Sequence, residues 1–140
     1  MAIKHGHRFE VDTPGTDSWR LRHEGGARRV VLAGPEDMVV MGGWGSTGEP
    51  SVKEVVNRFV SDAEIVVVEG YKTSNLPKIE VYRTAAHPEP FYQPDLPGSE
   101  QFLALVTDAP EIEVPIPVLD LNAPDLSDQL ADLVESRLLS

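Results

Sequence analysis

The chain has 140 residues, of which 41% are apolar, 25% charged and 6% aromatic, the balance of an ordinary globular protein with one core. Its 12 Lys and Arg residues against 23 Asp and Glu residues give a formal net charge of −11, which excludes a general nucleic-acid binder. The sequence contains no Cys, so disulfides, thiolate zinc sites and a Cys nucleophile are also excluded.

The charge is unevenly distributed along the chain. Residues 1–83 hold 11 Lys/Arg and 12 Asp/Glu, whereas residues 84–140 hold one basic residue, Arg137, and 11 acidic ones. An anion-binding site is therefore expected in the first part, and a solvated acidic surface in the second. No run of about 18 to 20 apolar residues that could span a membrane, and no apolar signal segment, is visible, so we expect a cytoplasmic protein that does not bind membranes.

The first half of the chain alternates between helical and extended patterns. Residues 17–24 predict a short helix that ends at two glycines. The apolar run 29–33 predicts a buried strand, and residues 38–41 predict a shorter one, followed by a Gly-rich loop at 42–48. Ser51 and Glu54 have the spacing of a capping box, which predicts the start of an amphipathic helix.

The second half continues this alternation. Four consecutive β-branched residues in the segment 64–69 predict a strand buried on both faces, as in parallel sheets. Further strands are predicted at 79–83, 102–107 and 117–121, with an irregular Pro-rich loop between the first two and a final helix after Asn122 or Asp125. The order of elements predicts one α/β domain over residues 1–140, with a mostly parallel sheet flanked by helices.

Glu69 is the residue whose position is most informative about chemistry. It ends a predicted buried strand, and the carboxyl ends of parallel strands are where α/β folds bind ligands. In P-loop nucleotide hydrolases an acid at such a position holds the water shell of Mg²⁺, although many strands simply end in Glu. Gly70 allows close backbone approach, and Lys72 and Lys78 add positive charge.

The opening segment holds a second group of candidate residues. Asp12 or Asp17 could contact Mg²⁺ through phosphates or water, because this ion uses few carboxylates and keeps its waters. His5 and His7 with Asp12 are metal-ligating residue types, but their spacing fits no standard zinc pattern, and solvated loop histidines are the favoured interpretation. The arginines within 20–29 either meet a phosphate or form a solvated face.

Two motifs are absent from the sequence. The phosphate-binding loop G-x-x-x-x-G-K-[ST] does not occur, and the Gly-rich run 42–48 is no substitute because no Lys-Ser or Lys-Thr follows it. No Ser has the context of a nucleophile elbow, so a catalytic triad is not supported.

Several blocks in order along residues 3–108 together resemble the molybdopterin-guanine dinucleotide biosynthesis protein B (MobB) family. They are K-H-G-H at 4–7, D-T-P-G-T-D-S-W-R at 12–20, Gly26-Ala27, V-E-G-Y-K at 68–72 and P-K-I-E-V at 77–81. The second block and the combination V-E-G-Y-K-(x)₄-P-K-I-E are specific when found together. The acidic part at 109–140, with the last helix, adds little to the resemblance.

The resemblance implies a P-loop NTPase-like fold and a GTP-binding protein, usually dimeric, that assists the attachment of GMP to molybdopterin. It implies GTP and Mg²⁺ as cofactors and a molybdenum cofactor nucleotidyltransferase as partner. The residues it places at the nucleotide are Lys4, Glu69, Gly70, Lys72 and Asp108; those it places at the metal are Asp12, Asp17 and Glu69.

The family opens with a strand, a P-loop and a helix before the position of Ile3, so relative to the family we expect this chain to be truncated at its N-terminus. We therefore expect impaired nucleotide binding and no GTPase activity of the chain alone. The alternative is a non-catalytic remnant or partner-binding module that no longer binds nucleotide. With one sheet strand absent, strand 64–69 should lose a neighbour, which predicts a homodimer or another partner chain at its open edge.

Overall fold

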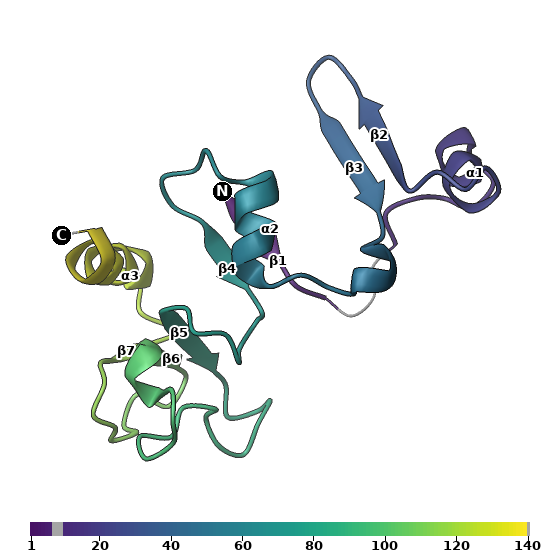
Figure 1. Cartoon of the computed structure of the whole chain (residues 1–140). Coiled ribbons are helices and arrows are strands. Elements are labelled where there is room, and N and C mark those ends of the chain that lie inside the picture. Colours follow the sequence, from purple (N-terminus) through teal and green to yellow (C-terminus); the bar gives the residue numbers. More distant parts are fainter. Residues whose placement is uncertain (7–9, 140) are drawn as a thin grey trace. The chain divides into compact units, whose positions relative to one another are not determined.

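A computed structural model describes residues 1–6 and 10–139, and the chain divides into two compact units, Met1–Tyr71 and Lys72–Ser140 (Figure 1). Each unit is described by itself below. The single domain over residues 1–140 stays a prediction. None of the helices in the described residues is long and apolar enough to cross a membrane.

The described residues of the first unit form two separate two-stranded sheets and two short helices. Its elements are β1 (Ala2–Lys4), α1 (Asp17–His23), β2 (Arg29–Ala33), β3 (Met38–Gly42), a 3₁₀ turn (Gly45–Thr47), α2 (Val52–Phe59) and β4 (Val67–Glu69). Strand β1 pairs with β4 in parallel, and β2 pairs with β3 in an antiparallel hairpin. All the helices and strands predicted for this part of the chain are present, and the Gly-rich loop contains the 3₁₀ turn.

The strand predicted at 29–33 forms, but not as a buried member of the parallel sheet. It runs antiparallel to β3, and only Val30 of its five residues is buried. The physical reason is the connection, since residues 34–37 are far too few for the dozen or more that a parallel crossover needs. The short turn is closed by a bond from Gly34 N to Asp37 O at 2.8 Å.

The prediction that segment 64–69 is a strand buried on both faces is also wrong. The strand is shorter, Val67–Glu69, and Val67 is 65% exposed. Among the described residues β4 pairs with β1 alone, so one of its edges is open. The β-branched run thus has the composition of an inner strand, while the pairing within its unit makes it an edge strand.

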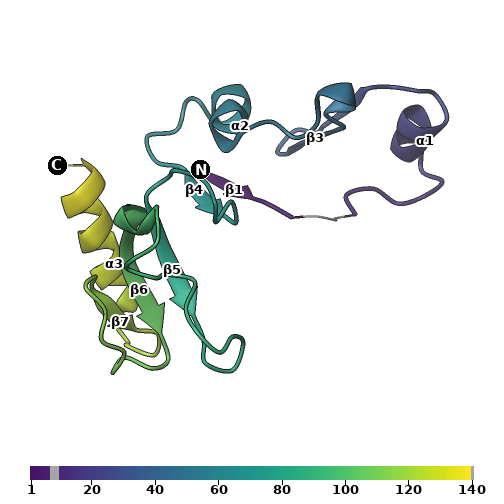
Figure 2. The same cartoon turned by 60° about the horizontal axis from the view of Figure 1, so that its bottom comes forward.

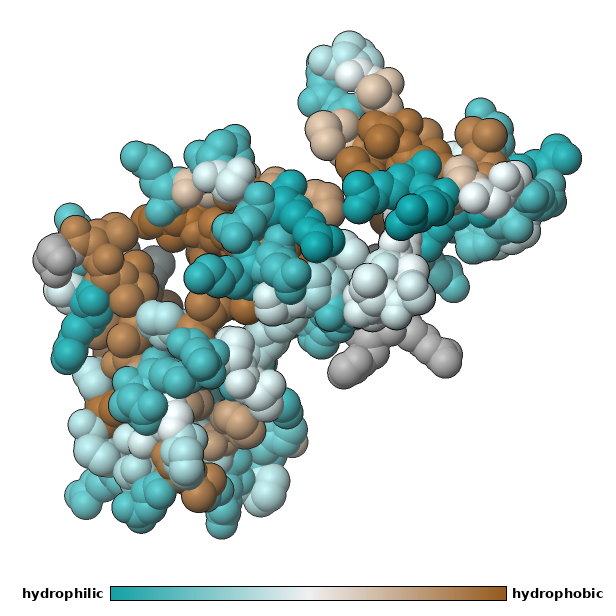
Figure 3. All heavy atoms as spheres, in the orientation of Figure 1, coloured by the Kyte–Doolittle hydropathy of each residue, from teal (hydrophilic) through white to brown (hydrophobic). Residues whose placement is uncertain are grey.

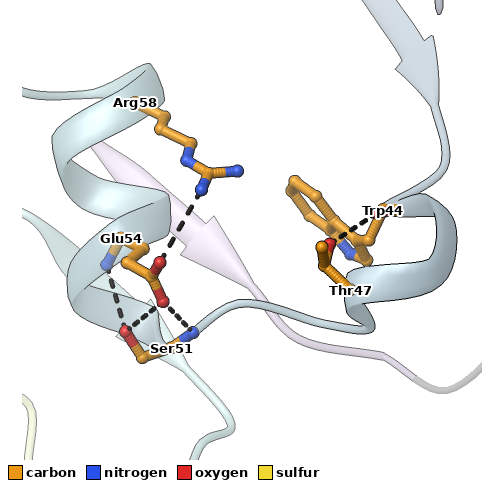
Figure 4. Close-up of polar contacts among 5 residues, drawn as sticks. All are labelled: Trp44, Thr47, Ser51, Glu54 and Arg58. Carbon is orange, nitrogen blue, oxygen red and sulfur yellow. Dashed lines mark hydrogen bonds and ion pairs between the residues drawn. The ribbon is translucent and has the colours of Figure 1, made fainter. Parts of the chain in front are cut away.

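Helix α2 begins with the predicted capping box (Figure 4). The Ser51 hydroxyl accepts a bond from Glu54 N at 3.4 Å, and the Glu54 carboxylate accepts one from Ser51 N at 3.0 Å. Val52 and Val55 are the buried residues of the helix. The pKa of Glu54 is lowered from its ordinary value of 4.5. The main cause is the hydrogen bond from the Ser51 backbone N–H to the Glu54 carboxylate, and the hydrogen bond with the Ser51 hydroxyl is the next.

Substituting Ser51 by alanine should destabilise the chain by about 1 kcal/mol at neutral pH, because the helix loses its N-cap. The Glu54 carboxylate has a lowered pKa in the folded state, so its stabilising effect is present at neutral pH and is lost as pH falls through that pKa. The difference between wild type and Ser51→Ala should therefore shrink in acid. Urea unfolding at several pH values measures this; a constant difference would contradict it.

The second unit is built on a three-stranded parallel sheet in the order β5-β6-β7 (Figure 2). The strands are β5 (Lys78–Tyr82), β6 (Phe102–Thr107) and β7 (Val118–Asp120), and a 3₁₀ turn (Ser99–Gln101) precedes β6. Helix α3 (Leu126–Val134) continues into a π-helical turn (Glu135–Leu139). Asp125 is at its N-cap but makes no side-chain cap bond.

The core of the second unit lies on its middle strand. Ala104, Leu105, Val106 and Thr107 are consecutive and buried, which confirms the prediction of a buried strand at 102–107. A strand with a parallel neighbour on each side and four buried residues in a row is the case in which an apolar run, not an alternation, is expected.

Candidate functional site

The parallel strands β1 and β4 bring two predicted site residues together at their carboxyl ends. Lys4 and Glu69 are register partners, and the Lys4 ammonium forms an ion pair with the Glu69 carboxylate. Both side chains are exposed. His5 continues β1 with a bond from its backbone N to Glu69 O at 2.9 Å. The predicted cluster at this sheet edge is thus formed by Lys4, Glu69 and the adjoining Gly70.

Gly70 lies so close to His5 that a side chain at this position would collide with it. It has a φ of +90°, and a Cβ built there would lie 2.8 Å from the Cβ of His5. The following Tyr71 also has a positive φ of 48°. Two successive left-handed residues at the end of a strand are unusual, and such conformations gather at functional sites.

Substituting Gly70 by alanine tests this close approach, and Gly15 supplies a matched control. Gly15 has a φ of +91°, but a Cβ there would have nothing within 4 Å. Both substitutions bear the roughly 1–2 kcal/mol cost of a left-handed alanine. Gly70→Ala should cost about 1 kcal/mol or more beyond Gly15→Ala in urea unfolding, because its methyl group meets His5. Equal losses would show that the contact with His5 does not matter.

Glu49 and Tyr71 belong to the same cluster and were not predicted from the sequence. His5 Nε2 lies 3.1 Å from Glu49 Oε1, Tyr71 OH donates to the same oxygen at 3.0 Å, and the rings of His5 and Tyr71 are 4.6 Å apart. The pKa of Tyr71 is raised, mainly because the hydroxyl is partly buried and also because of its hydrogen bond to Glu49 and the negative charge of that residue. Glu49 precedes α2 and approaches β1 only through folding, so no local pattern reveals it.

The predicted metal residues Asp12 and Asp17 lie around the start of α1. Asp12 Oδ1 accepts from Thr13 N, Thr16 Oγ1 and Ser18 Oγ, at 2.9, 3.0 and 3.1 Å, and Asp17 Oδ1 accepts from Ser18 N at 2.8 Å. Asp12 Oδ2 is buried and makes no hydrogen bond. These carboxylates act as acceptors that shape the turn before the helix.

These residues do not form a metal centre with Glu69. In the part of the chain that the structure describes, no three His, Asp or Glu side chains converge as metal ligands would. A single carboxylate that reaches Mg²⁺ through water needs no such cluster, so the roles of Asp12, Asp17 and Glu69 at the metal stay predictions. The alternative of a transition-metal site at His5, His7 and Asp12 includes His7, which lies outside the described residues.

Lys72, Lys78 and Asp108 lie in the second unit and have local partners there. The Lys78 ammonium donates to Lys72 O at 3.1 Å, Ser74 O at 2.5 Å and Gln101 Oε1 at 3.2 Å, so its charge stabilises the segment before β5. The Lys72 ammonium lies 5.4 Å from the centre of the Phe91 ring. Asp108 accepts from Thr84 N at 2.9 Å and so links the segments that follow β5 and β6.

Comparisons with known proteins agree with the resemblance. The family model described as "Molybdopterin guanine dinucleotide synthesis protein B" matches residues 1–108. A molybdopterin-guanine dinucleotide biosynthesis adapter protein of Haemophilus influenzae is 34% identical over 97% of this chain and 71% of its own length. The protein of the same description from Escherichia coli is 30% identical over 86% of this chain and 67% of its own length.

A solved structure supports the fold assignment. A crystal structure titled as molybdopterin-guanine biosynthesis protein B superposes with a TM-score of 0.69 over 98% of this chain and 79% of that chain, at 21% sequence identity. This likeness confirms an α/β, P-loop NTPase-like fold. The chain belongs to the molybdopterin guanine dinucleotide synthesis protein B (MobB) family.

Proposed function

We propose that this chain is an adapter protein of molybdopterin guanine dinucleotide biosynthesis that presents a GTP-facing edge at the ends of β1 and β4. The observation that supports the proposal is the family match over residues 1–108, which includes both strands of that edge. Its two curated relatives carry the same adapter description. The partners in this proposal are a molybdenum cofactor nucleotidyltransferase and a second copy of the chain.

The proposed nucleotide site has a simple division of roles. Lys4 faces the phosphates of GTP, Glu69 holds Mg²⁺ through water, and Gly70 lets the backbone come close to the ligand. For Lys72 and Asp108, which belong to the second unit, a role at the nucleotide stays a prediction. When Mg²⁺ and GTP are bound, the metal supplies charge neutralisation at the phosphates.

GTP binding by these 140 residues should nevertheless be weak. They contain no G-x-x-x-x-G-K-[ST] sequence, whose backbone N–H groups and Lys make most of the phosphate contacts in P-loop proteins. The chain alone is therefore proposed not to be an active GTPase.

Titration calorimetry with GTP and Mg²⁺ tests the proposal. We expect heat only at nucleotide concentrations near the millimolar range, and Glu69→Gln should remove the Mg²⁺-dependent part of it. Glu64→Gln is the matched control, because Glu64 is exposed and lies outside β4. Micromolar affinity would contradict impaired binding. The absence of heat, with retained binding to the nucleotidyltransferase in a pull-down, would favour the second candidate function.

That second candidate is a partner-binding module that does not bind nucleotide. The observation in its favour is the exposed apolar surface of the first unit, to which five of the ten hairpin strand residues contribute: Val31, Leu32, Met38, Val39 and Val40. Exposed apolar patches of this kind mark protein interaction sites.

A further inference from the structure

An open cavity of the first unit is lined by both tryptophans of the chain, Trp19 and Trp44. Its volume is about 1090 Å³, and small-molecule sites in proteins usually measure about 300–1,000 Å³. Strand β1, helix α1 with the segment before it, the β2–β3 hairpin and helix α2 all contribute to the lining. The apolar surface of the hairpin is brown in Figure 3. The cavity thus has the size of a ligand site and a largely apolar wall.

Two pairs of rings supply the aromatic part of this lining. The Trp19 ring stacks on the ring of His23, with 4.7 Å between the centroids and an angle of 26° between the planes. The rings of Trp44 and Phe59 lie 6.2 Å apart, and these residues are 38% and 47% exposed. Exposed aromatic side chains are the platforms on which proteins stack flat heterocyclic rings. The aromatic lining therefore fits a planar ligand.

Two arginines of the lining have no acidic partner. Arg22 of α1 is half-buried and Arg29 begins β2, and within the described residues neither guanidinium takes part in an ion pair. By contrast, Arg20 and Arg58 each pair with a glutamate on their own helix. A guanidinium presents a planar fork of donors that matches a phosphate group. Of the two interpretations that the sequence left open for these arginines, the cavity favours contact with a phosphate.

Carboxylates are also present in the lining. Glu10 is exposed, and Asp12 Oδ2 is buried without a hydrogen-bond partner. Buried polar atoms are almost always hydrogen-bonded, so an unpaired acceptor at a cavity indicates a ligand that brings N–H donors. Pterins and guanine share such an edge, a ring N–H beside an exocyclic amine, which pairs with a carboxylate. Aromatic rings, carboxylates and arginines together therefore match a phosphate ester of a bicyclic ring that carries this edge.

We propose that this cavity binds a pterin phosphate, with the ring among the aromatic side chains and the phosphate at Arg22 and Arg29. The choice of a pterin over guanine rests on the proposed function, which already places the guanine nucleotide at the ends of β1 and β4. Attaching GMP as a dinucleotide joins two phosphates, so the pterin in that reaction carries one of its own. Ile3 lines the cavity and directly precedes Lys4, so the pterin and the nucleotide would be held along the same strand.

Titration with 6-hydroxymethylpterin phosphate, followed by tryptophan fluorescence, tests this proposal. Both tryptophans line the cavity, so binding should quench their emission to saturation at micromolar ligand. Arg22→Gln/Arg29→Gln should weaken binding on the order of tenfold or more, because charge-assisted hydrogen bonds to the phosphate are lost. Unphosphorylated 6-hydroxymethylpterin should bind the double variant and the wild type equally. Arg28→Gln is the matched control, because Arg28 is exposed and is not part of the lining.

Calorimetry with Trp44→Leu supplies a second readout, which separates the ring from the phosphate. This variant should weaken the phosphorylated and the unphosphorylated pterin alike, since stacking does not depend on the phosphate. GMP should displace the pterin phosphate only weakly. No saturable quenching in the wild type, equal binding to the wild type and the double arginine variant, or displacement by GMP at pterin-like concentrations would each overturn the proposal. GTP binding is measured with a different ligand, so either titration can fail while the other succeeds.

Discussion

Replacing Leu105 by alanine should lower the free energy of unfolding by about 2–5 kcal/mol, because a large side chain is removed from the core. The Leu105 side chain has no exposed surface, and its strand β6 is hydrogen-bonded on both sides, to β5 and to β7. The side chains around Leu105 are held in place by the paired strands, so they cannot easily move into the space left by the missing atoms. Urea unfolding followed by circular dichroism measures the loss.

Val81→Ala is the matched control for this prediction. Val81 lies on the adjacent strand β5, pairs with Val106 of β6, and is 63% exposed. Its substitution should change the free energy of unfolding by less than about 1 kcal/mol, since little apolar surface is returned to water. If Leu105→Ala cost no more than Val81→Ala, β6 would not be the core of its unit.

The elements that the sequence predicted well are those whose signals are local. The capping box of Ser51 and Glu54 specifies the start of α2 from four residues, and both of its bonds are present. Strand β6 was predicted as buried from its own apolar run, and it lies between β5 and β7, the strands that precede and follow it in the chain. In both cases the signal for the element is contained in the element's own residues.

The predictions that failed concerned pairing between distant segments. The runs at 29–33 and 64–69 have the composition of inner strands, yet composition does not say which strand lies beside them. A signal for the first was available, because a connection of four residues permits only an antiparallel neighbour. For β4, pairing with β1 joins residues more than sixty positions apart, and its other edge has no partner strand among the described residues.

The candidate site shows the same difference between local signals and contacts that only folding creates. Lys4, Glu69 and Gly70 were predicted from strand ends and from the resemblance, and the structure brings them together with His5. Glu49 was missed because only folding brings it to His5 and Tyr71. The nucleotide, metal and catalytic roles themselves stay predictions, which the titrations described above address.

Glu80 is the second residue whose loss should be severe, because it holds the Pro-rich segment against the sheet of the second unit. Its two carboxylate oxygens accept from the backbone N–H groups of Phe91 and Tyr92, at 2.5 and 2.7 Å. Pro90 has no N–H, so these are the first two donors that follow it. Tyr92 is buried, and its ring lies 5.2 Å from that of Phe102 on β6.

Glu80→Ala should therefore destabilise the chain by roughly 2–4 kcal/mol in urea unfolding, because two hydrogen bonds to a charged acceptor are lost and two backbone donors lose their partner. Glu80→Gln keeps one acceptor oxygen, so its loss in the free energy of unfolding should be about half as large. Glu111→Ala removes an exposed carboxylate of the same unit and should have almost no effect. Hydrogen exchange locates the cause, since the amides of Phe91 and Tyr92 should lose protection in Glu80→Ala before the rest of the sheet does. Unchanged protection of those two amides would mean that the aromatic contacts with Phe102, and not the carboxylate, hold the segment in place.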